Sequence, residues 1–519
     1  MNKQFAFLKK LFPVFLAITV LSISCKKYIY QAPITSTYGS EFWISETSVQ
    51  QACNAMYGQL RSALRQDNSY FINGDLTAGV FQVTYGVQWN LSPVGVNNPY
   101  SGGPYNFSYV PYLEGSLQNW SRFYRIIAQA NLILENVPKM SNSLFKNGEA
   151  DKDTYLGQAL FMKAYTYFYI TRIWGDPVFV SKTFDDVDYG KIPPIARTPE
   201  GQVLDSCLSY LTTASGYLDF KGGDPTAAIS PNKGSVYALM AHIYEWKKDY
   251  KSAHLACQEV INNGGYSLEP MDTYKNIWKG ESSNESIFEL SMKYNPNDPH
   301  FNSGSDWAEA EFGFFGVFLK GSIVDNRKTS CWIANAGGIA DVLFDTANDQ
   351  RAKQILNLVN ASGSSPKGYM LLKYTNFLYQ NADNKSGAYI DNNLVLLRLS
   401  DIILLDAEAL AYSGDLEGAR NDLKLTEDRA GITSYENPTT QYDMIDEVVM
   451  ERGRELIGEG QWYYDLIRTE PTQGWLEYVG YQAGRVTPEQ KGYYWPLDMG
   501  TLFPQDNLLT QNPYWATHK

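Results

Sequence analysis

Two separate stretches of the chain carry the same pattern of paired helices, and this repeat limits the possible folds more than any other feature. In the first stretch, the helical periodicity of 234–262 places Ala241 and Ala253 on either side of a short turn. In the second, Ala407 and Ala419 have the same separation, with a Gly-Asp turn between them. Small residues at such positions let two antiparallel helices approach closely. A stack of helix hairpins is therefore the expected scaffold.

The spacing within each pair is that of a tetratricopeptide-type hairpin, which predicts a right-handed α-α superhelix. Apolar residues at helical spacing predict helices at 46–64, 115–136, 151–174, 198–218, 234–247 and 251–262. Three regions instead are rich in Gly, Asn and aromatic residues and lack a regular period: 68–114, 266–393 and the tail from 474. The sequence thus predicts a mainly α fold, in which a tetratricopeptide-like helix-hairpin scaffold carries a large irregular, loop-rich lobe.

The N-terminus has the pattern of a signal peptide. Basic residues precede an apolar run at 11–23, and Ser24 stands directly before Cys25. A cysteine at the cleavage point predicts lipoprotein processing, in which Cys25 becomes acylated and several acyl chains hold the protein at a membrane. Ser22 replaces the leucine that usually stands three residues before that cysteine, so an ordinary secretory signal is the alternative.

After residues 1–24 are removed, the length of 25–519 allows one large domain or two closely packed ones, and we expect a single domain. Within it we expect N-terminal helices and binding loops at about 40–190, a helical-repeat scaffold at about 197–265 and 394–470, an irregular lobe at about 266–393, and a C-terminal segment at 471–519.

Composition excludes some ligands and favours others. The net charge is −13, which argues against nucleic acid or an anionic membrane surface as the ligand and leaves neutral polymers as the natural candidates. Aromatic residues make up 14% of the chain, and they suit both helix packing and stacking on sugar rings. The later cysteines have no metal-ligand spacing and are expected to be buried free thiols: Cys53, Cys207, Cys257 and Cys331.

A charged helix near the C-terminus could be mistaken for acid-base machinery. Glu451, Glu455 and Glu459 lie at helical spacing on one face, but arginines are interleaved with them. Opposite charges in this arrangement favour a structural ion-pair network. His242 and His254 are interpreted as packing residues, and the chain shows no metal, phosphate-binding or nucleophile motif. The sequence therefore predicts no enzyme activity, no metal and no cofactor.

Five blocks in order resemble the SusD/RagB family and span nearly the whole chain. They are 158–177, which ends in Trp174-Gly175-Asp176-Pro177, then 244–266, 398–431, 451–468 and 495–514. In the fourth block, Glu451-Arg452 and Glu459-Gly460 are the most specific matches. Ile457-Gly458 and Gln461 depart from the usual pattern, and we expect them to loosen the local helix packing.

The resemblance implies a role and a location. A member of this family is expected at the outer membrane of a Gram-negative bacterium, lipid-anchored and exposed at the cell surface. It would capture oligosaccharides or polysaccharides and deliver them to a SusC-like TonB-dependent barrel transporter. Whether the cargo is a glycan or, as in some relatives, a peptide stays open.

Ligand-binding residues are expected in the two irregular, aromatic-rich regions, because aromatic faces stack on sugar rings and polar side chains bond sugar hydroxyls. The candidates are Asp75, Tyr85, Trp89, Tyr100, Tyr294, Trp307 and Trp332. Two alternatives to a glycan-binding role stay open: a surface-attached glycoside hydrolase, whose two carboxylates the sequence does not mark, and a helical-repeat scaffold of the envelope that binds proteins.

Overall fold

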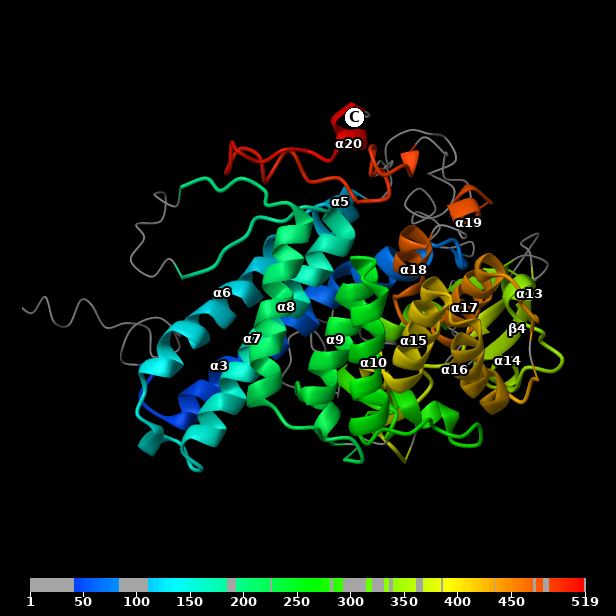
Figure 1. The fold of residues 1–519 in the computed structure, drawn as a ribbon, viewed down its shortest axis with the longest axis horizontal. Coiled ribbons are helices and arrows are strands. Elements are labelled where there is room, and N and C mark those ends of the chain that lie inside the picture. The colour runs from blue at the N-terminus through cyan, green and yellow to red at the C-terminus, as the bar shows by residue number, and fades with distance from the viewer. Residues whose placement is uncertain are drawn as a thin grey trace, which may run out of the picture.

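The computed structural model describes residues 42–83, 111–183, 193–224, 226–280, 283–292, 314–319, 331–335, 339–360, 367–383, 386–433, 435–469, 473–478 and 485–517. Most of these residues are helical, and the longer helices stand side by side (Figure 1). Within these ranges, no helix combines the length and the apolar character that a membrane span requires. The mainly α prediction is confirmed.

An N-terminal layer is built from three long helices, α3 (Glu46–Arg65), α6 (Ser121–Asn136) and α7 (Glu149–Trp174). Helix α3 begins at a capping box in which Ser45 and Ser48 bond each other's backbone N–H groups. Helix α7 packs between α6 and α8 (Glu200–Tyr217), and nearly all its side chains from Leu156 onward are buried. Because of this central position, α7 buries residues on all of its sides, including the charged Lys163 and Arg172.

The two predicted hairpins are present and adjacent. The first joins α9 (Lys233–Trp246) to α10 (Tyr250–Asn263), and the second joins α15 (Leu399–Ser413) to α16 (Leu416–Arg429). Ala241, Ala253, Ala407 and Ala419 are all fully buried. Helix α10 packs against α15, so the hairpins stack, and α17 (Gln441–Glu455) continues the row (Figure 1). The tetratricopeptide-like scaffold is confirmed.

The turns of the two hairpins use the same N-cap chemistry. Asp249 and Asp415 each accept a hydrogen bond from a backbone N–H in the first turn of the following helix. Gly414 ends α15 at a φ of +87°, a left-handed conformation that favours glycine. The rings of Tyr250 and Tyr412 stack with centroids 4.2 Å apart and link one hairpin to the other.

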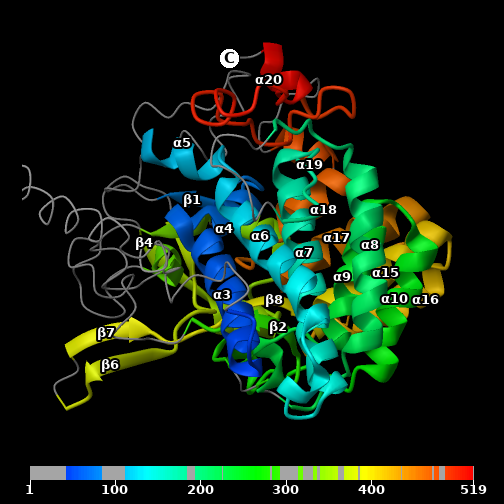
Figure 2. The ribbon, with the colours of Figure 1, turned by 90° about the vertical axis from the view of Figure 1, so that its left-hand side faces the viewer.

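Within the described residues, the irregular lobe and the segments next to it form three small antiparallel sheets. One has the order β1 (Phe81–Val83), β3 (Trp332–Asn335), β5 (Lys367–Leu371), β4 (Leu356–Asn360). A second pairs β2 (Ser286–Leu290) with β8 (Leu394–Arg398). The third is a hairpin of β6 (Phe377–Asn381) and β7 (Ser386–Ile390), which projects from the body (Figure 2).

Short helical segments complete the fold. They are η1 (Gln66–Asn68), α4 (Ser69–Phe71), η2 (Ile72–Leu76), α5 (Pro111–Leu117), η5 (Val137–Lys139), η6 (Asn142–Leu144), η7 (Ala227–Ile229), η8 (Tyr274–Trp278), η9 (Phe314–Phe318), α13 (Ile339–Leu343), α14 (Gln350–Ile355), α18 (Trp462–Arg468), α19 (Gln473–Tyr478) and α20 (Pro513–Thr517). The C-terminal segment, red in Figure 1, is mostly loop, as the sequence predicts.

One sequence expectation about the fold is wrong. The loop expected to begin at residue 68 is instead a run of buried helical turns, α4 and η2, followed by β1. The reason is tertiary: the Cα of Gly74 sits so close to Gly460 that a Cβ there would lie 2.1 Å from the Gly460 carbonyl oxygen. Residues 84–110 lie outside the described residues.

Candidate functional site

A network of buried charges lies where α17 meets the lobe. Arg398 binds Glu285 and Glu455 through Nη1, at 2.7 and 2.6 Å, and Glu459 through Nε at 2.9 Å. Arg351 binds Glu451 at 2.5 Å and Glu455 at 3.0 Å. Burial alone would raise the pKa of Glu455, but the surrounding arginines, Arg429 foremost, hold it well below its usual range.

A second group of ion pairs ties α17 to α15 and α18. Arg452 bonds Asp401 and Asp465, both at 2.8 Å, and His242 bonds the other oxygen of Asp401 at 2.7 Å. Burial alone would raise the pKa of Asp401, but His242 and Arg452 together hold it below its usual range. His254 bonds Asp406 at 2.6 Å. These contacts join elements of the scaffold, so the predicted structural network is confirmed.

Two of the predicted ligand-binding residues, Asp75 and Trp332, are fully buried in the protein. Asp75 accepts hydrogen bonds from the Gly458 N–H at 3.1 Å and the Gly460 N–H at 2.7 Å. It therefore fastens η2 to the turn after α17, and burial raises its pKa to about 8. Trp332 is fully buried in β3, with its ring 5.7 Å from that of Phe318.

The remaining predicted residues lie outside the described residues. They are the ligand-binding candidates Tyr85, Trp89, Tyr100, Tyr294 and Trp307, and the lipidation candidate Cys25. Their roles stay predictions. The four later cysteines are buried free thiols, as expected: Cys53, Cys207, Cys257 and Cys331.

The expected loosening of packing after α17 is also wrong. Ile457 is buried, and Gly458 and Gly460 have φ values of +73° and +72°, which suit glycine. Gln461 accepts a hydrogen bond from Arg172 Nη1 at 3.1 Å and is itself buried. The departures from the family pattern are therefore accommodated by specific contacts.

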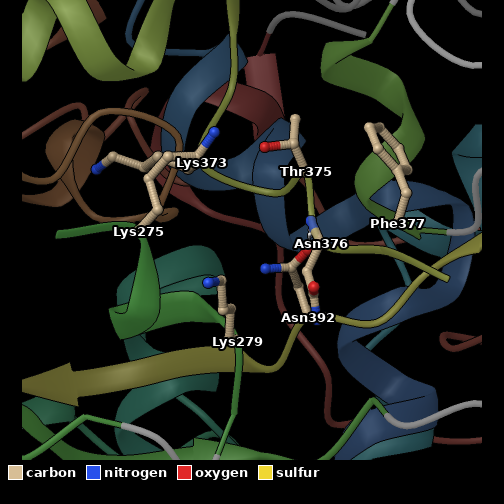
Figure 3. A pocket seen from close by; sticks show the side chains of 7 residues that line it. All are labelled: Lys275, Lys279, Lys373, Thr375, Asn376, Phe377 and Asn392. Carbon is tan, nitrogen blue, oxygen red and sulfur yellow. Dashed lines mark hydrogen bonds between the residues drawn. The ribbon is translucent and has the colours of Figure 1, made fainter. Parts of the chain in front are cut away.

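A polar pocket of about 430 Å³ opens beside this network. Its described lining comprises Lys275, Lys279, Lys373, Thr375, Asn376, Phe377 and Asn392. In Figure 3, the two lysines from η8 and the residue after it lie on one side, and the segment from Thr375 to Phe377 lies on the other. The pocket thus stands between η8, the start of β6 and the connection from β7 to β8.

Backbone and amide hydrogen bonds fix the pocket walls. Asn392 donates through Nδ2 to the Trp278 carbonyl oxygen at 2.8 Å, and its Oδ1 accepts from the Asn376 N–H at 3.0 Å. Asn376 Nδ2 in turn donates to the Asp391 carbonyl oxygen at 2.6 Å. One buried amide, that of Asn392, therefore joins the two walls of the pocket.

The three lysines of the pocket differ in environment. Lys373 is buried, and its Nζ binds Glu459 at 2.5 Å and donates to the Glu455 carbonyl oxygen at 2.8 Å. Burial lowers the pKa of Lys373 to about 8. Lys275 is partly buried, and its pKa is lowered by burial and by the neighbouring charge of Lys279. Lys279 is exposed and donates to Asn276 Oδ1 at 2.8 Å.

Sequence reasoning missed this pocket. Its lining comes from two segments about a hundred residues apart, and neither contains a motif. Lys275 and Lys279 stand four residues apart in the sequence, and the charge of Lys279 helps to lower the pKa of Lys275, so the two cations are neighbours. That spacing is a signal for two neighbouring cations, but only the fold brings Asn376 and Asn392 opposite them.

Comparison with solved structures defines the class of fold. A SusD homologue from Bacteroides thetaiotaomicron superposes with a TM-score of 0.73 at 23% identity, over 92% of this chain and 99% of that one. NanU of B. fragilis superposes with a TM-score of 0.69 at 19% identity, over 94% of this chain and 100% of that one. The chain therefore has the SusD-type fold.

Sequence comparison supplies the family. The SusD family model matches residues 356–515, and a second model, described as starch-binding and associating with the outer membrane, matches 97–244. SusD-like protein P38 of Formosa agariphila is 24% identical, over 99% of this chain and 100% of that protein. The chain belongs to the SusD family, whose members are generally glycan-binding proteins rather than enzymes.

Proposed function

We propose that this protein is a cell-surface lipoprotein that captures oligosaccharides and delivers them to a SusC-like TonB-dependent transporter in the outer membrane. The observation that carries the proposal is the match of two SusD-type family models to two separate stretches of the chain, 97–244 and 356–515, on a fold of the same type. The N-terminal pattern that ends at Cys25 supports lipid anchoring. The chain performs no bond cleavage in this scheme.

Glycan binding is tested by calorimetry with residues 26–519, the mature chain without its lipid-carrying Cys25, against a panel of oligosaccharides and polysaccharides. Saturable binding without product release supports the proposal. Sustained release of shorter sugars would instead identify a surface-attached glycoside hydrolase. Binding of peptides in place of glycans would identify a peptide-binding relative, and binding of envelope proteins alone would identify a scaffold.

Anchoring and partnership need the full-length chain in a Gram-negative host. We expect radiolabelled palmitate to be incorporated into the wild type but not into Cys25→Ala, which should leave the outer-membrane fraction. We also expect a large TonB-dependent barrel protein to co-purify with the wild type from detergent-solubilised outer membranes. Equal labelling of both forms, or purification without a barrel, would contradict this part of the proposal.

A further inference from the structure

We infer that the pocket between η8 and β6 binds an anionic group of a glycan, a uronic acid carboxylate or a sulfate ester. This inference deepens the proposed function and rests on it, because it names the class of sugar that one site on the protein accepts. It rests on the cavity itself, on the charges that line it and on the neutral groups beside them.

The charge balance of the pocket carries the inference. Lys373 is neutralised by Glu459 and faces the buried network. Lys275 and Lys279, by contrast, form no ion pair with any carboxylate in the described part of the chain, and none of the described lining residues is acidic. Two positive charges that repel each other, one of them partly buried, favour a negative partner between or beside them.

The negative net charge of the protein is compatible with an anion bound in this pocket. The chain carries a net charge of −13, which disfavours long polyanions at most of its surface. At physiological ionic strength, however, exposed charges are screened beyond roughly 8 Å. A single carboxylate or sulfate inside the pocket therefore responds mainly to Lys275 and Lys279.

The rest of the lining suits a sugar rather than a free ion. Phe377 is partly buried and offers an apolar ring edge or face, while Thr375 and Asn376 supply oxygen atoms that can accept hydrogen bonds from hydroxyls. Asn376 uses its Nδ2 group on the Asp391 carbonyl, and its Oδ1 is a hydrogen-bond acceptor. A volume of about 430 Å³ lies within the range of roughly 300–1,000 Å³ typical of small-molecule sites.

The test compares matched pairs of ligands by calorimetry on the mature chain. One pair is tetragalacturonic acid and its methyl ester, and the other is a sulfated galactan tetrasaccharide and its desulfated form. We expect the charged member of at least one pair to bind at least tenfold more tightly than its neutral partner. The pair that shows the preference distinguishes a carboxylate from a sulfate as the natural group.

Variants connect that preference to the pocket. Lys275→Met and Lys279→Met should each reduce affinity for the charged ligand about three- to tenfold, and the double variant should abolish the preference. Lys275→Arg should retain it. The matched control is Lys251→Met, because Lys251 is an exposed lysine on α10 of the scaffold; this variant should bind as the wild type does.

The outcomes separate the inference from the proposed function. If the protein binds neutral glycans and shows no preference for either charged ligand, the inference is overturned and the proposed function stands. A preference that survives in the double variant also overturns the inference, because the anion then binds elsewhere. If the protein binds no glycan at all, charged or neutral, both the inference and the proposed function are wrong.

Discussion

At the scale of single residues, an aromatic or acidic side chain that is buried stabilises the fold, and only one at the surface can contact a ligand. Asp75 and Trp332 lie in regions rich in Gly, Asn and rings, where the sequence predicts exposed binding loops, yet both are inside the protein. Composition indicates which side chains are suited to sugars. It does not indicate which side chains the fold covers, because that depends on contacts between distant segments such as β1 and β3.

Trp332→Ala is therefore expected to affect stability first. The ring is fully buried and packs against Phe318 and Phe81. Loss of a buried aromatic side chain of this size leaves a cavity and costs about 3–5 kcal/mol of unfolding free energy. Urea denaturation followed by circular dichroism measures it. A variant as stable as the wild type, but impaired in ligand binding, would contradict the buried position.

Asp75→Asn tests the link between η2 and the turn after α17. Each carboxyl oxygen of Asp75 accepts one backbone N–H, whereas an amide can accept with only one atom. We expect a loss of about 1–3 kcal/mol, the usual cost of leaving one buried donor without a partner. Asp383→Asn, at an exposed position in the β6–β7 hairpin, serves as the control and should unfold as the wild type does.

The stability conferred by Asp75 should also depend on pH. Its pKa is raised from 3.8 in the unfolded chain to about 8 in the folded protein by burial, so the folded state holds the proton over that interval. Stability contributed by this group therefore falls as pH rises from about 4 to 8. We expect the difference in unfolding free energy between wild type and Asp75→Asn to shrink over that range. A difference that stays constant between pH 4 and 8 would show that the carboxyl of Asp75 is already ionised in the folded protein.

At the scale of elements, local patterns predict helices well and pairings of strands poorly. The hairpins of α9 with α10 and of α15 with α16 follow from paired alanines with the same separation, so the sequence predicts both pairs, and the Gly-Asp turn of the second, from local pattern alone. The run from α4 to η2 has no helical period, and within it Gly74 lies directly against Gly460, a residue far away in the sequence. A contact between residues so far apart in the sequence produces no periodic pattern from which it could be predicted.

Ala407→Leu tests the close approach of the stacked hairpins. Ala407 is fully buried on α15, which packs against α10, α16 and α17. Extra methyl groups in a filled core force neighbouring helices apart and cost about 1–3 kcal/mol. Thermal unfolding should show a lower Tm than in the wild type. Ala150→Leu, on the exposed first turn of α7, provides the matched control and should leave Tm unchanged.

At the scale of the whole molecule, buried ion pairs hold the lobe against the scaffold. Glu455 on α17 binds Arg351 before β4, Arg398 at the end of β8 and Arg429 at the end of α16. The sequence predicts a structural role for the charged helix, but the partners outside it are found only in the fold. The pocket was missed for the same reason, since its two walls meet only after the lobe has folded.

Glu455→Gln should destabilise the whole protein strongly. It removes the negative charge that three buried arginines share. Breaking a buried ion pair from one side costs about 3–5 kcal/mol, because the remaining charge stays buried without compensation. Limited proteolysis alongside urea denaturation would report the loss for the lobe and the scaffold together. A protein that loses less than about 1 kcal/mol would contradict this role.

The contact of Lys373 with Glu459 has a kinetic consequence. Lys373 lines the pocket and is bonded to Glu459, in the same turn that Asp75 holds through Gly460. These contacts do not depend on a sugar, so the pocket is formed before a sugar binds. A sugar can therefore enter the pocket without a conformational change of the protein. Capture should accordingly proceed in a single exponential phase whose rate rises linearly with sugar concentration, the behaviour of a rigid receptor.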